Sequence, residues 1–145
     1  MKEISAQLKF LLGMARAQAL ISRSFDGHLG GGLSFNDFQV LYYLSRATDE
    51  KMRRIDLADK MALTASGVTR MLLPMEKIGL VRREASEHDA RVSYVKLAAG
   101  GKRLLGERIQ DAELVASEIV PMADGKKAVD LEEIFKIFTL GRTHI

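Results

Sequence analysis

The chain has 145 residues, 47% of them hydrophobic, which suits one compact domain with a substantial core and excludes a disordered chain. Its 22 basic and 19 acidic side chains give a net charge of +3, too small by itself to indicate a polyanionic partner. The lack of cysteine excludes disulfides, thiolate zinc sites and sensing by thiol oxidation.

The first predicted element is a long helix over residues 3–25, because apolar side chains recur there every three or four residues. This stripe consists of Ile4, Leu8, Leu11, Leu12, Ala15 and Ala19. The longest apolar stretch, residues 4–21, contains Lys9 and Arg16 and therefore does not qualify as a membrane span, and no cleavable signal pattern precedes it. We expect a soluble, cytoplasmic protein without a membrane partner.

Three glycines at 30–32 are interpreted as a linker after this helix. Ser34 followed by Asp37 has the pattern of a capping box and predicts a second helix that ends near Ser45. Its core-facing side chains are Phe38, Leu41 and Leu44. The polar residues 48–51 predict a loop.

Residues 54–61 and 65–78 are predicted to form the two helices of a helix-turn-helix. Five apolar side chains are expected on the buried face of the second helix: Val68, Met71, Leu72, Met75 and Ile78. Thr64 is expected to cap its first turn through the side-chain hydroxyl. Pro74 removes one backbone hydrogen bond, at a cost of about 3 kcal/mol in a helix interior, so we expect a kink there but no break.

Gly79 fits the end of that helix, and residues 80–84 and 92–97 predict a two-stranded hairpin with a polar tip. A further amphipathic helix is predicted over residues 101–119, and a last helix over 127–140. The first and last helices carry more apolar side chains than one buried face requires. This surplus suggests an interface with a second copy of the chain.

The exposed side of the predicted helix over 65–78 carries side chains suited to DNA. Ser66, Thr69 and Arg70 point away from the core, and hydroxyls and an arginine in this place can hydrogen-bond base edges and phosphates in a major groove. The nearby cations that we assign to phosphates are Arg53, Arg54, Lys60 and Arg82. Phosphate contacts add affinity and salt dependence but little sequence information.

The order of these elements and several short stretches resemble the MarR family of bacterial transcription regulators. The stretches are residues 33–38, 66–70, 76–83 and 89–91, followed by Leu97 and Gly101. The resemblance covers nearly the whole chain and implies a mainly α (α+β) fold, a winged helix-turn-helix with long N- and C-terminal dimerisation helices. Residues 1–145 would form a single domain, in which 1–32 and 101–145 dimerise and 33–100 bind DNA.

The resemblance also implies a homodimer on a roughly palindromic double-stranded DNA site, with two recognition helices about one helical turn, on the order of 34 Å, apart. By the family pattern, Asp89 orients Arg91 at the wing so that it reaches the minor groove, where a narrow groove attracts arginine. The candidate DNA-binding residues are therefore Arg53, Arg54, Lys60, Thr64, Ser66, Thr69, Arg70, Arg82, Asp89 and Arg91. The chain departs from the family pattern at Ala62, where glycine is common, and at Gly67, where a hydroxyl is frequent.

The family resemblance implies a pocket for a small aromatic or phenolic effector between the long helices and the winged module, whose binding shifts the dimer away from DNA. The candidate ligand-binding residues are Arg16, His28, Tyr42 and Tyr43. Packing in the core or at the dimer interface is the alternative role for these four. We expect no metal and no cofactor, because His28, His88 and His144 lack the spacing of metal ligands.

The prediction from the sequence is thus a sequence-specific transcription regulator, a ligand-responsive repressor more readily than an activator. We expect no enzyme activity, since no serine has an identifiable base partner. The alternative function is a winged-helix module that binds a protein partner through Leu73, Pro74 and the wing, without specific DNA binding.

Overall fold

Five α-helices and a three-stranded sheet make up residues 2–120, the part of the chain that this computed structural model describes. The elements are α1 (Ala6–Asp26), α2 (Phe35–Arg46), a 3-10 turn (Thr48–Glu50), β1 (Lys51–Arg53), α3 (Arg54–Met61), α4 (Ala65–Lys77), β2 (Val81–Ala85), β3 (Ser93–Leu97) and α5 (Ala99–Ile119). The winged helix-turn-helix expected from the sequence is confirmed. The helix predicted over 127–140 lies outside the described residues.

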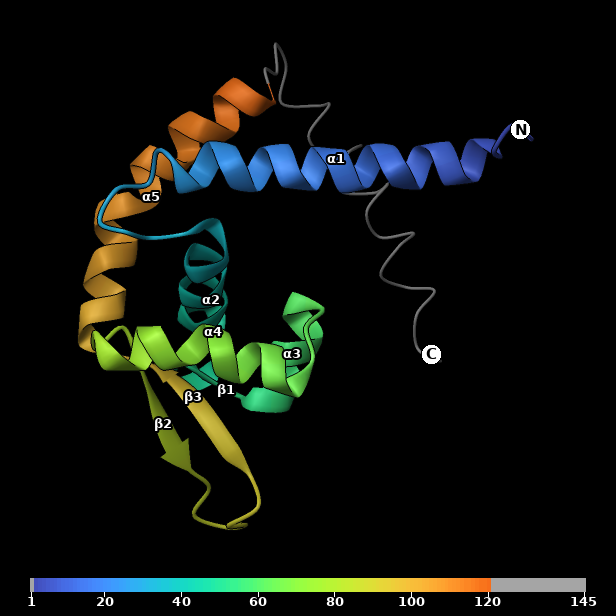
Figure 1. The fold of residues 1–145 in the computed structure, drawn as a ribbon. Coiled ribbons are helices and arrows are strands. Elements are labelled where there is room, and N and C mark those ends of the chain that lie inside the picture. The colour runs from blue at the N-terminus through green and yellow to red at the C-terminus, as the bar shows by residue number, and fades with distance from the viewer. Residues whose placement is uncertain (1, 121–145) are drawn as a thin grey trace.

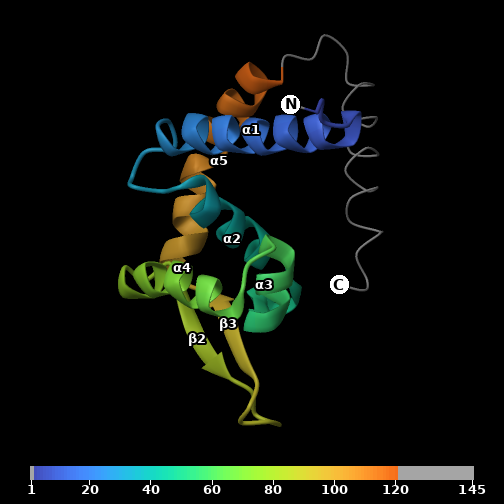
Figure 2. The same cartoon turned by 45° about the vertical axis from the view of Figure 1, so that its right-hand side comes forward.

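The long helices and the wing occupy opposite ends of the molecule (Figure 1). Helices α1 and α5 cross at one end, and α2 leads from them to α3, α4 and the sheet. The hairpin of β2 and β3 projects away from α4 in both views (Figures 1 and 2). None of the described helices is long and apolar enough to cross a membrane.

The predicted caps at the helix starts are present. The hydroxyl of Ser34 accepts a hydrogen bond from the Asp37 N–H at 3.0 Å, and the Asp37 carboxylate accepts one from the Ser34 N–H at 3.3 Å, which completes a capping box at α2. At α4, the hydroxyl of Thr64 accepts a hydrogen bond from the Gly67 N–H at 3.1 Å. Helix α1 begins three residues later than predicted because Ser5 caps it.

Helix α4 continues through Pro74 without a break and ends at a left-handed glycine. Gly79 has φ +77°, its N–H donates to the Glu76 carbonyl at 3.1 Å, and the Leu80 N–H donates to the Met75 carbonyl at 2.9 Å. These two bonds form a Schellman motif, which satisfies the carbonyls of the last turn and aims the chain into β2.

The sheet has the order β1-β3-β2 with both pairings antiparallel, and β1 is a strand that the sequence analysis missed. Lys51, its first residue, falls in the predicted loop over 48–51. Three residues are too few to show a period-two pattern. Strand β1 instead depends on pairing with β3, for example Met52 opposite Val95, more than forty residues later in the chain.

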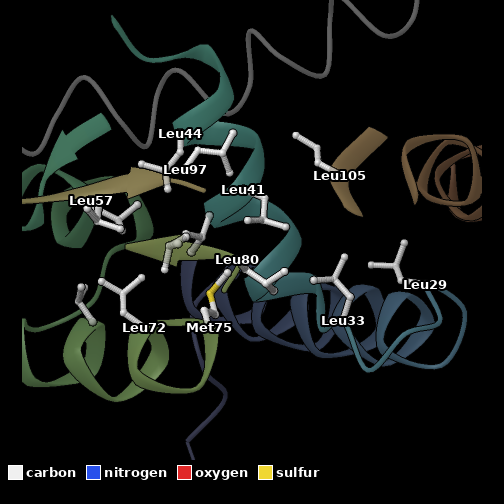
Figure 3. Packing of buried hydrophobic residues seen from close by; sticks show 14 of the residues in the cluster. Leu29, Leu33, Leu41, Leu44, Leu57, Leu72, Met75, Leu80, Leu97 and Leu105 are labelled. Carbon is white, nitrogen blue, oxygen red and sulfur yellow. The ribbon is translucent and has the colours of Figure 1, made fainter. Parts of the chain in front are cut away.

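The core lies where α2, α3, α4 and the sheet meet, and it extends through Leu29 and Leu33 to Leu105 of α5 (Figure 3). The fully buried side chains include Leu41, Leu44, Leu57, Leu72 and Val95, all at 0% exposure. On α4, the prediction is confirmed for Val68, Leu72 and Met75, while Met71 is half-buried against the core. It is wrong for Ile78, which is 70% exposed because the helix ends there; Leu80, two residues later, is buried instead.

Gly101 lies in the first turn of α5, where this long helix contacts the winged module. A Cβ atom added at this position would lie 2.1 Å from the carbonyl oxygen of Leu80 and 3.0 Å from a methyl carbon of Leu41. The first turn of α5 therefore approaches the start of β2 so closely that only glycine fits. This contact fixes the angle at which α5 leaves the winged module.

The predicted apolar stripe of α1 is exposed in the described chain. Ile4 and Leu8 are each 43% exposed, Leu11 51% and Leu12 56%. Within α1, Phe25 near its end is the one buried residue. The first part of α1 therefore presents an apolar surface that the described residues do not cover.

Candidate nucleic-acid interface

Helix α4 presents the predicted polar side chains on its open surface. Ser66, Thr69 and Arg70 are exposed, as is Lys77 about two turns further along. No hydrogen bond or ion pair among the described residues occupies the Arg70 guanidinium. Its five N–H donors are therefore available to an acceptor such as a guanine edge or a phosphate.

Thr64 shapes the start of α4. Its hydroxyl accepts the Gly67 N–H and lies 3.2 Å from the hydroxyl of Ser66. A Cβ at Gly67 would be 3.2 Å from the same oxygen, which is tighter than an ordinary contact. The glycine that departs from the family pattern therefore leaves room for the cap, and Thr64 contributes mainly by positioning the helix N-terminus.

The tip of the wing is a turn closed by side-chain hydrogen bonds. The hydroxyl of Ser86 accepts hydrogen bonds from the N–H groups of His88 at 3.2 Å and Asp89 at 3.3 Å. The carboxylate of Asp89 accepts hydrogen bonds from the Arg91 N–H at 2.9 Å and from Arg91 Nε at 3.3 Å. The expected orientation of Arg91 by Asp89 is thus present, and the Arg91 side chain remains 92% exposed.

Arg53, the residue before α3, pairs with a carboxylate in the first turn of that helix. Its Nε lies 2.9 Å and its Nη2 3.1 Å from the two oxygens of Asp56, a bidentate geometry. The hydrogen bond from Arg53 lowers the pKa of Asp56, and the same bond raises the pKa of Arg53. Both side chains are about half exposed, so Arg53 lies at the surface with part of its charge neutralised.

Arg54 is the most buried of the four cations assigned to phosphates, and its contact with phosphate stays a prediction. Its side chain is only 15% exposed and extends from the first residue of α3 toward α4. There Nη1 lies 3.4 Å from Glu76 Oε1, and Nη2 donates to the Thr69 hydroxyl at 3.1 Å. Glu76 supplies a carboxylate across the helix pair, a contact that the sequence spacing does not reveal.

Three cations form a row across the outer face of the sheet. Lys51 of β1 and Arg82 of β2 both lie opposite Lys96 of β3, on the side away from the buried Val95 and Leu97. Arg82 was predicted from the sequence and the two lysines were not, because the row exists only through the strand register. The Lys51 ammonium lies 3.7 Å from Glu84 Oε2 and 4.9 Å from the centroid of the Tyr94 ring, so its charge is partly compensated. Lys96 and Arg82 have no ion pair among the described residues, and like charges that face each other directly favour an anionic partner such as a phosphate backbone.

Lys60 and Tyr43 lie together on the winged module, with the ammonium 5.1 Å from the ring centroid. Lys60 remains exposed, as its predicted contact with phosphate requires. Tyr43 is thus a partner of a cation on α3 and not a wall of the pocket described next.

An open apolar pocket with a volume of about 240 Å³ lies where α1, α2 and α5 meet. The described residues that line it are Phe25, Phe35, Phe38, Tyr42, Ile109, Ala112, Glu113 and Ala116. Phe25 and Phe35 stack on each other with ring centroids 4.3 Å apart. Glu113 is the charged side chain among these lining residues, so the pocket suits an aromatic group better than an acid.

Of the four predicted ligand-binding residues, Tyr42 lines this pocket. The imidazole Nδ1 of His28 lies 2.6 Å from the Ser24 carbonyl oxygen, at the exposed end of α1, and Arg16 is exposed on the same helix. The phenylalanines come from the consecutive helices α1 and α2, and they were missed because the pocket forms only where the distant helix α5 packs against both. No group of three or more His, Cys, Asp or Glu residues within 2–120 is arranged to hold a metal ion.

Comparisons with known proteins agree with this geometry. A sequence model described as the MarR family matches residues 31–92. The HTH-type transcriptional regulator MhqR of Bacillus subtilis (strain 168) is 25% identical over 130 residues, which are 89% of this chain and 88% of that protein. The transcriptional regulator HosA of Escherichia coli O157:H7 is 30% identical over 96 residues, which are 65% of this chain and 68% of that protein.

The fold also matches solved structures. Sco3205, a MarR family transcriptional regulator from Streptomyces coelicolor solved in complex with DNA, superposes with a TM-score of 0.81 at 21% identity. The match covers 99% of this chain and 92% of that one. At this identity the match supports the fold.

Proposed function

This chain belongs to the MarR family of DNA-binding transcription regulators, and we propose that it acts in the cytoplasm as a homodimer on a specific palindromic duplex. We further propose that it represses transcription until a small aromatic molecule binds. The alternative function, a protein-interaction module built on Leu73 and Pro74, gains no support from the comparisons.

The proposal rests on two exposed arginines that lie at different places on the winged module. Arg70 lies free on the exposed face of α4, and Arg91 stands 92% exposed at the tip of the wing, held by Asp89. A helix in a major groove and an arginine in the neighbouring minor groove read one half-site together. Lys96 and Arg82 in the row across the sheet would hold phosphates and supply affinity.

The far end of the molecule supports a homodimer. Exposed apolar side chains continue from α1 to α5, where Leu114 is 64% exposed. Pairing of these surfaces between two copies would bury them and would place two winged modules on one side of the assembly. A duplex with two half-sites one helical turn apart fits such a twofold arrangement.

The pocket beside α1 supports an effector that couples to DNA binding. Its walls come from α1 and α5 on one side and from α2 of the winged module on the other. A ligand wedged there would change the angle between the modules of a dimer and so the spacing of the two recognition helices. Because Glu113 lines the pocket, a neutral or cationic aromatic compound fits better than a phenolic acid.

Selection of duplexes from a random library, followed by fluorescence-anisotropy titration of the selected and a scrambled duplex over a salt series, tests the function. We expect about a 10³-fold or greater preference for the selected duplex and a steep negative salt slope on both. Arg70→Ala should weaken binding to the selected duplex more than to the scrambled one. Equal, weak binding of the wild-type protein to both duplexes would refute the proposal.

A further inference from the structure

Arg54 links the two helices of the helix-turn-helix through side chains that face each other. Its guanidinium lies 3.4 Å from Glu76 Oε1 and 3.1 Å from the Thr69 hydroxyl, and the side chains of Arg54 and Glu76 are only 15% and 24% exposed. A guanidinium held by a carboxylate in such a place is fixed in direction. The Thr69 hydroxyl therefore accepts a hydrogen bond from a guanidinium whose position is fixed by Glu76.

The same hydroxyl is engaged on its other side. Thr69 donates its one hydroxyl hydrogen to the Ala65 carbonyl at 3.1 Å, one turn back along α4, while it accepts from Arg54. A hydroxyl has a single hydrogen to donate. Thr69 therefore has no donor left for a base or a phosphate, although the residue lies on the exposed surface of the recognition helix.

We propose that Arg54 is a positioning residue that commits the Thr69 hydroxyl to the protein, so that Thr69 reads DNA through its methyl group and favours the 5-methyl of a thymine. This inference rests on the proposed DNA-binding function and states how one side chain of that site distinguishes thymine from the other bases. Apolar contact with the thymine methyl is an established way for a threonine to recognise a base.

The charges around Arg54 argue against direct phosphate contact. Its guanidinium is paired with Glu76 and largely buried, whereas Arg82 is exposed and lies in a row of cations. To reach a phosphate, Arg54 would have to leave Glu76 half-buried without its cation, which is costly. The two arginines therefore differ in a measurable way: only contact with phosphate changes the number of counterions released.

The first test measures the thymine methyl directly. A duplex selected by the wild-type protein is resynthesised with single thymines replaced by uracil, which removes one methyl group at a time. We expect about a fourfold loss of wild-type affinity at one half-site position, the effect of one buried methyl group. T69V, which keeps the methyl and lacks the hydroxyl, is expected to retain this thymine preference within about twofold, and T69S is expected to abolish it.

The second test separates positioning from phosphate binding. R54Q is expected to lower affinity for the selected duplex about tenfold while leaving the slope of log K against log salt unchanged. R82Q is the matched control, since it removes an exposed arginine and should reduce the slope by about 1 per protomer. The double variant R54Q/E76Q removes both charges together. A loss of affinity in this variant therefore cannot be due to an unpaired Glu76 carboxylate.

Each outcome of these tests either supports the proposal or overturns it. Thymine preference retained by T69V, lost in T69S and weakened in R54Q/E76Q at constant salt slope supports the proposal. A slope reduced in R54Q as much as in R82Q, or thymine preference lost in T69V and kept in T69S, overturns it. Failure of the wild-type protein to select any duplex would instead refute the DNA-binding function, before either test applies.

Discussion

The two ends of this molecule differ in how completely one chain pairs its own surfaces. At the winged end, Leu57, Leu72 and Val95 are fully buried, and Arg54 is held between two helices. At the other end, Leu12 and Leu114 are 56% and 64% exposed. The winged module can therefore hold its shape within one chain, whereas the long helices present a surface that becomes complete against a second copy.

The largest effect is expected at Gly101, the joint between the two ends. Gly101→Ala places a Cβ 2.1 Å from the Leu80 carbonyl oxygen, so α5 must move away from β2, at a cost that we estimate as about 3 kcal/mol or more. Urea unfolding followed by circular dichroism measures this loss. Gly106→Ala, in the same helix with open space around the added Cβ, should instead stabilise by about 1 kcal/mol.

A charge placed on the exposed apolar stripe of α1 tests whether the long helices form the dimer interface. Leu12→Glu should convert the dimer to monomers and weaken binding to a two-half-site duplex by about 100-fold, because each module then binds alone. Sedimentation velocity and anisotropy report the two effects. Gln7→Glu adds the same charge at another exposed position of α1; if it dissociated the dimer equally, the apolar stripe would not be the contact.

The wing tip gives a smaller effect that is confined to binding. Arg91→Ala should weaken DNA binding about tenfold and leave the melting temperature unchanged, because the side chain is 92% exposed. Asp89→Asn keeps the arginine and loses its ionic partner, so we expect only about a threefold loss. A fall in melting temperature with Arg91→Ala would mean that this arginine also stabilises the folded wing.

The smallest effect concerns strain inside the otherwise well-paired winged end. Ala62, between α3 and α4, adopts a left-handed conformation with φ 53°, which costs a non-glycine residue about 1 kcal/mol. Ala62→Gly should therefore raise the free energy of unfolding by about 0.5 kcal/mol. Ala17→Gly, at an exposed interior position of α1, should lower it by a similar amount; a loss of stability in both would show that Ala62 is not strained.

Local signals predicted the winged module well. Residues 54–61 match α3 at both ends, and α4 ends one residue earlier than predicted. Ser34, Thr64 and Gly79 marked helix ends because each satisfies a backbone group within a few residues of itself. Such interactions depend on short stretches of sequence and can be recognised without the fold.

The missed features all depend on long-range contacts. Strand β1 exists through its register with β3, and Arg54 is removed from the exposed cations by Glu76, twenty-two residues away. The pocket is lined by side chains from three helices. Of these side chains, only Tyr42 was predicted from the sequence to bind a ligand. The DNA-binding roles of Ser66, Arg70 and Arg91 remain predictions for the experiments above.

The row of Lys51, Lys96 and Arg82 makes salt act differently on the free protein and on its DNA complex. In the free protein, dissolved ions screen the repulsion between Lys96 and Arg82, which the register places opposite each other, and also the attraction between Lys51 and Glu84. In the complex, the same ions compete for the phosphates and promote release. Salt is therefore expected to change the affinity for DNA much more than the stability of the wing.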